Sequence, residues 1–160
     1  MPTSTQTRHR SSALLDHLAR LTRLRAESAL APLGLRPRHL VALTVLREHG
    51  SPTQQALAAA LQTDRTNLIG LLNELETDGL ILRRRSTEDR RRHFVELTGD
   101  GAKRLAEAEA ALAAAEDEVL GALDAEQRES LYQLLAQATS SHAVDCAGAA
   151  AAEEPPADGC

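Results

Sequence analysis

Six arginines lie within ten consecutive residues near the middle of the chain. They form two triplets, separated by Ser86-Thr87-Glu88-Asp89: Arg83, Arg84, Arg85, Arg90, Arg91 and Arg92. A guanidinium group stays charged at physiological pH and presents a planar set of donors that matches phosphate oxygens. Two carboxylates cannot neutralise six arginines locally. The cluster therefore predicts binding to a polyanion, for which the phosphate backbone of a nucleic acid is the obvious candidate.

The residues on either side of the arginines predict a two-stranded ribbon. Leu80–Leu82 form an apolar run before the cluster, and residues 93–98 alternate between two faces after it. A tight turn near residues 86–89 would join the strands. An alternative remains open, in which the arginines only keep the exposed edge of a solvated hairpin from pairing with another chain.

Two helices are predicted before this ribbon. Ser51 can cap the first helix, with Pro52 at its first position and Gln54 completing a capping box, although Thr53 is an equally good cap. This helix continues through residues 55–61. After a short polar break, Thr63 can cap a second helix.

The second helix is predicted from Asp64 to about Asp78, and Gly79 ends it. Its apolar positions recur at helical spacing: Leu68, Leu71, Leu72 and Leu75. Arg65 and Asn67 lie in its first turn, where a helix-turn-helix contacts base edges in the major groove. Arginine suits guanine and asparagine suits adenine. Taken singly, each is more simply an ordinary surface residue, so the inference depends on their position before an arginine-rich ribbon.

The chain resembles the MarR family of bacterial regulators in its winged helix-turn-helix. The resemblance rests on Gly79-Leu80-Ile81 and on the motif Asp-Arg-Arg-x-x-x-Val-x-Leu-Thr at residues 89–98, and it extends over about residues 14–139. It implies that Asp89 orients the guanidinium of Arg91, which would enter a minor groove. It also implies a homodimer, a double-stranded operator as partner, and repression as the usual mode.

The expected DNA-binding residues come from the two helices and the ribbon. They are Thr53, Gln54, Asp64, Arg65, Thr66, Asn67, Gly70, Arg83, Arg84, Arg85, Asp89, Arg90, Arg91 and Arg92. Not all of the arginines can face DNA at once, because side chains alternate along a strand.

The expected fold is mainly α with a small β-hairpin wing, in which a winged helix-turn-helix at about 37–98 joins a helical dimerisation frame. The frame helices are expected at about 11–32, 100–121 and 124–141, in one MarR-like domain of residues 11–141. Thr98 can cap the second frame helix, and Asp124 with Gln127 can cap the third. Residues 1–10 and the acidic segment 142–160 are expected to be disordered tails.

The charge distribution and the cysteine content limit the possible functions and cellular location. The formal net charge is −5, but the segment from Ala143 onward supplies four of those negative charges and no lysine or arginine, so the positive field is local to the ribbon. Cys146 and Cys160 are the two cysteines, which excludes a disulfide scaffold and favours the cytoplasm. No targeting or membrane-spanning segment is expected.

A small effector is a further expectation from the resemblance, because family members commonly bind aromatic or phenolic anions. The candidate lining residues are His17, Leu21, Arg25, His39 and Leu43. The two histidines are more simply ordinary helix residues. No cofactor, metal site or catalytic motif is expected, so an enzyme is disfavoured. The alternative function is a ligand-insensitive accessory or architectural DNA-binding protein.

Overall fold

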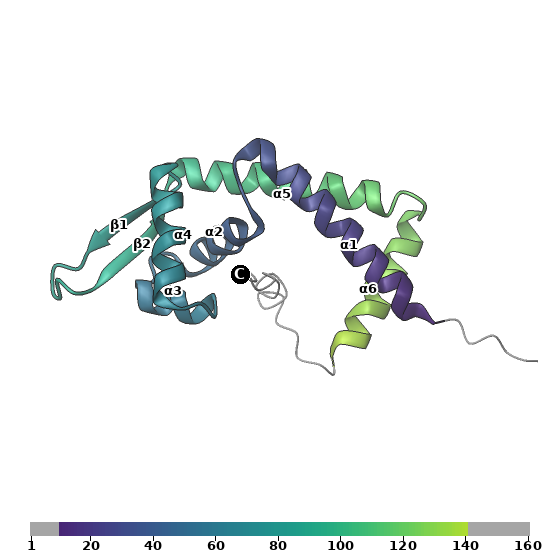
Figure 1. Cartoon of the computed structure of the whole chain (residues 1–160), viewed down its shortest axis with the longest axis horizontal. Coiled ribbons are helices and arrows are strands. Elements are labelled where there is room, and N and C mark those ends of the chain that lie inside the picture. Colours follow the sequence, from purple (N-terminus) through teal and green to yellow (C-terminus); the bar gives the residue numbers. More distant parts are fainter. Residues whose placement is uncertain (1–9, 141–160) are drawn as a thin grey trace, which may run out of the picture.

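The computed structural model describes residues 10–140, which form an elongated, mainly helical molecule (Figure 1). In chain order its elements are α1 (Ser11–Leu30), a 3-10 turn (Ala31–Leu33), α2 (Pro37–His49), α3 (Gln54–Ala60), α4 (Arg65–Thr77), β1 (Ile81–Arg85), β2 (His93–Leu97), α5 (Gly99–Val119) and α6 (Ala125–Ser140). The expected fold class, mainly α with a small β-hairpin, is confirmed.

The two ends of the molecule differ in their packing. Helices α2, α3 and α4 and the hairpin gather at one end, α1 and α6 lie at the other, and α5 runs between them (Figure 1). Most of the buried side chains belong to the first end, among them Leu43, Leu57, Leu72 and Ile81, and Leu105 of α5 adds to them. Rigid helix packing at this end therefore holds α4 and the hairpin in fixed positions.

A glycine allows α5 to begin close against the hairpin. A Cβ atom on Gly101 would lie 2.0 Å from the carbonyl oxygen of Leu80, so any other residue would force the two apart. Thr98 caps this helix, since its Oγ1 accepts from the Gly101 N–H at 2.9 Å and donates to the Gly79 carbonyl at 2.7 Å. The predicted Thr98 cap is thereby confirmed, and the hairpin is anchored to α5.

Of the two caps that the sequence allowed for α3, Thr53 is confirmed, and the start at Ser51 with Pro52 at the first helical position is wrong. Thr53 is the N-cap, and its Oγ1 accepts from the Ala56 N–H at 3.1 Å. The preceding segment is instead extended beside β2: the Pro52 carbonyl accepts from the Val95 N–H at 3.0 Å, and Thr53 forms a bridge with Phe94. Pairing with the hairpin thus outweighs the local helix-start signal at Ser51 and Pro52.

The predicted cap of α4 is wrong by one residue. Asp64, not Thr63, is the N-cap, and its Oδ1 accepts from the N–H groups of Thr66 and Asn67 at 2.8 and 3.0 Å. Thr63 instead completes the end of α3, because its N–H donates to the Ala58 carbonyl at 3.0 Å. The intervening Gln62 has a positive φ of 49°, which turns the chain sharply between the two helices.

The antiparallel hairpin pairs Ile81 with Leu97 and Arg85 with His93, and residues 86–92 form its tip. We call this hairpin with its tip the wing. The predicted tight turn at 86–89 is too short: the Ser86 N–H donates to the Arg92 carbonyl at 2.9 Å, and a second turn brings the Arg92 N–H to the Asp89 carbonyl at 2.9 Å. The second arginine triplet therefore lies in the tip rather than on a strand.

At the far end, α1 packs along α5 and leaves large apolar side chains exposed. Leu14 and Leu24 of α1 and Tyr132 and Leu134 of α6 expose between 63% and 72% of their surface. The predicted capping box of α6 is present between Asp124 and Gln127, with both reciprocal hydrogen bonds formed. The expected tails, with both cysteines, lie outside the described residues, apart from Arg10.

Candidate nucleic-acid interface

The start of α4 presents an orientated amide. Asn67 donates from Nδ2 to Oδ2 of Asp64 at 2.6 Å, while the other carboxylate oxygen caps the helix. The hydrogen bond from the Asn67 backbone is the main reason that the pKa of Asp64 lies below its ordinary value. Asp64 therefore acts on the position of Asn67, and its carboxylate is already occupied by the helix end.

Beside Asn67, the outer face of α4 is open. Arg65, Thr66 and Gly70 are all exposed, and a Cβ atom added to Gly70 would meet nothing within 4 Å. The opposite side carries the four predicted core leucines, all of which are buried. Residues predicted to face DNA and residues predicted to face the core thus lie on different sides of this helix.

Two of the six arginines are neutralised within the fold. Arg83 donates from Nε to Glu76 of α4 at 2.9 Å and from Nη2 to Asn73 at 2.8 Å. The hydrogen bond from Arg83 to Glu76 is the main reason that the pKa of Glu76 lies below its ordinary value. Arg84 pairs with Glu96 across the hairpin at 3.2 Å. The expectation that the arginines cannot be neutralised locally is therefore wrong for this pair.

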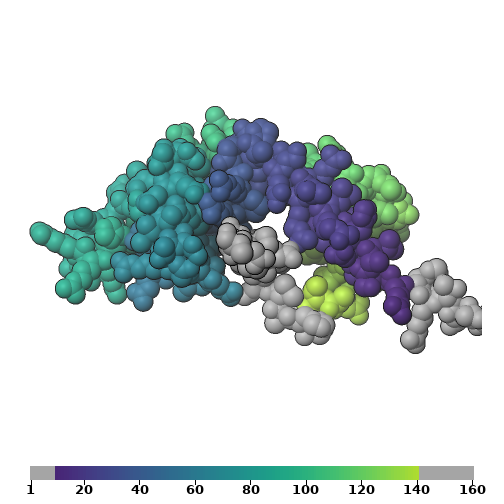
Figure 2. All heavy atoms as spheres, viewed as in Figure 1, coloured from purple at the N-terminus to yellow at the C-terminus, as the bar shows by residue number. Residues whose placement is uncertain are grey.

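The other four arginines extend from the end of the wing, and no described acidic side chain forms an ion pair with any of them: Arg85, Arg90, Arg91 and Arg92. In the space-filling view the wing tip projects beyond the rest of that end of the molecule (Figure 2). Unpaired, exposed guanidinium groups on a projecting hairpin suit phosphate or a groove of negative potential.

Asp89 shapes the tip through the backbone. Its Oδ1 accepts from the Arg91 N–H at 2.9 Å, whereas the expected contact was with the guanidinium. Ser86 adds a second local constraint, because its Oγ accepts from the N–H groups of Glu88 and Asp89, each at 3.2 Å. These side chains order the loop and leave the guanidinium of Arg91 free of described partners.

A cavity of about 480 Å³ lies between α3, α4 and the wing. It is lined by Thr53, Gln54, Gln55, Ala58, Arg65, Leu68, Ile69, Arg91, Arg92 and His93. The fold thus brings the first residue of α4 and two tip arginines to one groove, although 26 positions separate Arg65 from Arg91 in the sequence.

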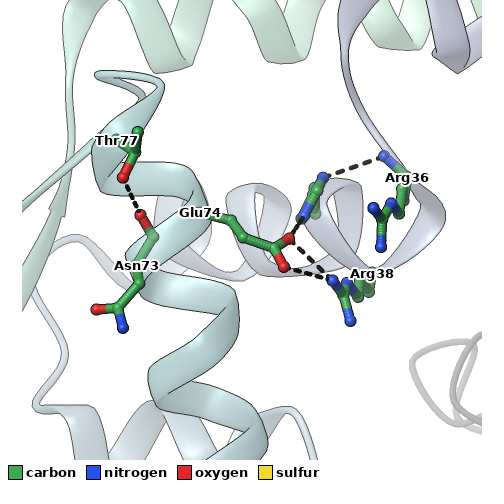
Figure 3. Close-up of polar contacts among 6 residues, drawn as sticks. Arg36, Arg38, Asn73, Glu74 and Thr77 are labelled. Atoms are coloured by element: carbon green, nitrogen blue, oxygen red, sulfur yellow. Dashed lines mark hydrogen bonds and ion pairs between the residues drawn. The ribbon is translucent and has the colours of Figure 1, made fainter.

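A second polar cluster ties α4 to α2. Glu74 accepts two hydrogen bonds from Arg38, at 2.7 and 2.9 Å, and a third contact of 2.7 Å comes from Nε2 of His39 (Figure 3). These bonds lower the pKa of Glu74, with that from His39 as the largest cause. Glu74 and Arg38 were not predicted, because their contact joins residues 36 positions apart and no local pattern signals it.

Neither of the two cavities found among residues 10–140 brings the five candidate effector residues together. His17 and Arg25 are exposed on α1, where Arg25 lies 3.7 Å from Glu118, while Leu43 is fully buried in the core. The cavity of about 510 Å³ beside His39 is lined by Gly34, Arg36, His39, Asn73, Glu74, Thr77 and Asp78. None of the other four candidates belongs to that lining.

The helix pair and the hairpin behind it define a winged helix-turn-helix protein. The model of the MarR family matches residues 35–93, which include both helices and most of the wing. A candidate transcriptional regulatory protein for the hcr operon of Thauera aromatica is 34% identical over 93 residues, or 58% of this chain and 56% of that protein. The winged part of the chain is therefore similar to the MarR family of transcriptional regulators, and the chain spans about half the length of the curated relative that it matches.

Solved structures are similar to this chain over most of its length. YusO of Bacillus subtilis is 25% identical, with a TM-score of 0.69 over 82% of this chain and 92% of that one. A variant of S. aureus MepR bound to an oligodeoxyribonucleotide is 26% identical, with a TM-score of 0.65 over 84% and 98% of the two chains. Among the described helices, none is long and apolar enough to cross a bilayer.

Proposed function

We propose that this protein is a sequence-specific, homodimeric repressor that binds a pseudo-palindromic DNA operator in the cytoplasm. The observation that carries the proposal is the single groove shared by Arg65 of α4 and by Arg91 and Arg92 of the wing tip. In this arrangement α4 enters a major groove and the wing reaches the flanking minor groove. The DNA bound by the related MepR variant supports the choice of ligand.

Within the interface, the roles follow from the partners of each residue. Arg65, Thr66 and Asn67 are placed for base edges, with Gly70 allowing close approach and Asp64 holding Asn67 in position. Thr53 and Gln54, at the start of α3, lie beside the phosphates. Arg85, Arg90 and Arg92 contact phosphates and Arg91 enters the minor groove, while Asp89 fixes the tip. Arg83 and Arg84 position the wing through their ion pairs.

The exposed apolar side chains of α1 and α6 support the dimer. Leu14 and Leu24 on one helix and Tyr132 and Leu134 on the other would be costly to leave in water, and a second copy would bury them. Two-fold symmetry then requires two half-sites about 10 bp apart, centre to centre. Sedimentation analysis should find a dimer, and Leu134→Asp should shift it toward monomer.

The proposal also includes a small effector that releases the protein from DNA. A small phenolic or carboxylate ligand in the cavity beside Arg36 and His39 would lie next to the contact between α2 and α4. Tighter binding to a conformation in which α4 is displaced would release DNA. A panel of benzoates and phenols, added to the protein–DNA complex, should contain a compound that lowers affinity. If none does, the ligand-insensitive alternative gains support.

The experiment that tests DNA recognition is selection of duplexes from a pool with a randomised core, followed by sequencing. The proposal predicts an inverted repeat with the half-site spacing given above. Enrichment of no sequence, despite salt-sensitive binding, would instead indicate an architectural DNA-binding protein.

A further inference from the structure

Ile69 is an apolar residue in an unusual position on α4. It exposes 37% of its surface, whereas the neighbouring Leu68, Leu71 and Leu72 expose 8% or less. The other exposed residues along this helix are polar, apart from Gly70. Ile69 therefore lies outside the leucine face by which α4 packs on the core.

The surroundings of Ile69 belong to the groove shared by the helix and the wing. It lines the same cavity as Arg65, one turn before it on α4, and as Arg91 of the wing tip. Gly70, the next residue, leaves open space on the outer side of the helix. A base pair that Arg65 can reach would therefore lie close to the Ile69 side chain as well.

An exposed isoleucine in a major groove can distinguish thymine from the other bases. Thymine carries the one methyl group that a base pair displays there, and an apolar side chain distinguishes it by burying that methyl group. Isoleucine is branched at Cβ and strongly prefers one χ1 rotamer in a helix, so the methyl group on its Cβ has a fixed position. The polar neighbours of Ile69 can form hydrogen bonds to base edges, but its own side chain cannot.

We propose that Ile69 is a specificity-determining residue that contacts the C5 methyl group of a thymine in each operator half-site. The inference rests on the proposed DNA-binding function and adds one named base to it. Arg65 and Asn67 would supply the polar contacts to neighbouring base pairs.

The test uses a duplex selected by the wild-type protein from the randomised pool. Each thymine is replaced singly by deoxyuridine, which keeps the O4 acceptor and the pairing but lacks the methyl group. Kd for the wild type should rise about fourfold at one thymine of each half-site, the effect of losing one buried methyl-sized group. In Ile69→Ala the same replacement should change nothing, and Ile69→Val should give an intermediate penalty.

Thr66→Ser provides the matched control, because it removes a neighbouring methyl group and keeps the hydroxyl. The deoxyuridine penalty should persist in this variant. The inference is overturned if no thymine shows a penalty, if the penalty persists in Ile69→Ala, or if Thr66→Ser abolishes it. All three outcomes require a selected duplex, so they leave specific DNA binding intact. A failure of the selection itself would count against the proposed function.

Discussion

His39 on α2 and Glu74 on α4 form a partly buried link between the two helices, with the histidine ring buried and the carboxylate half-exposed. The Arg36 N–H donates to Nδ1 of His39 at 3.1 Å, so the proton of the neutral ring lies on Nε2, which donates to Glu74 at 2.7 Å. Both ring nitrogens are thereby satisfied by the fold. His39 therefore fixes the orientation of α4 relative to the rest of the winged helix.

Replacing His39 by alanine should destabilise the protein by about 1–3 kcal/mol, because the Arg36 N–H loses its acceptor and Glu74 keeps only the hydrogen bonds from Arg38. Urea denaturation followed by circular dichroism measures the change. His17→Ala is the matched control, since His17 is exposed on α1. Equal midpoints for the two variants would show that the link contributes nothing to stability.

The Glu74 carboxylate should make stability depend on acid pH. Its pKa in the folded protein lies below the ordinary value of 4.5, so its contribution is present above pH 4.5 and is lost as the pH falls through the folded pKa. Glu74→Gln should therefore have a lower free energy of unfolding than the wild type near neutral pH. The difference between the two proteins should become smaller below pH 4.5. If the difference in the free energy of unfolding between Glu74→Gln and the wild type is the same at neutral and acid pH, the ionic role of Glu74 is contradicted.

Asp64→Ala should lower both stability and sequence discrimination. Loss of the N-cap costs about 1 kcal/mol, and Asn67 loses the contact that orientates its amide. Asp64→Ser should keep the cap but not the contact with Asn67. Thermal unfolding and binding to specific and random duplexes separate the two effects. If Asp64→Ser discriminates as well as the wild type, orientation of Asn67 by Asp64 is unimportant.

The arginines of the wing should fall into two groups. Arg91→Ala should weaken operator binding by about 1–3 kcal/mol and relax preference at the minor-groove step. Arg83→Ala should instead lower stability, because it leaves Glu76 without its partner, and should keep the salt dependence of binding. Titrations at several salt concentrations distinguish the two. The assignment fails if Arg83→Ala reduces the salt slope as much as Arg90→Ala or Arg92→Ala does.

Arg65→Ala and Asn67→Ala should lose discrimination between operator and random DNA more than they lose non-specific binding. Both side chains lie in the first turn of α4, which is the part of the second helix from which a helix-turn-helix reads base edges. The measurement is the ratio of Kd values for the two duplexes. Equal losses on both duplexes would make them positioning residues only.

Local patterns in the sequence predicted the helices and the wing well. The leucine spacing in α4 and the capping box at Asp124 both depend on residues within a few positions of each other, which a sequence displays directly. The cap of α3 was predicted less well, because Ser51 and Pro52 satisfy local rules while the segment actually pairs with β2.

The partners of the charged residues could not be predicted in the same way. Arg83 finds Glu76 only because the chain reverses between α4 and β1, and His39 finds Glu74 only when α2 packs against α4. Consequently the sequence overstated the number of arginines free for DNA. It also suggested an effector role for His39, whose ring is already held by the fold.

The most direct test of the central claim is a fluorescence-anisotropy titration of the selected duplex and a scrambled duplex at two salt concentrations. The account predicts that the selected duplex binds at least about a thousandfold more tightly and that both affinities fall as salt rises. Equal affinities with the same steep salt dependence would contradict it, because only phosphate contacts would then be present.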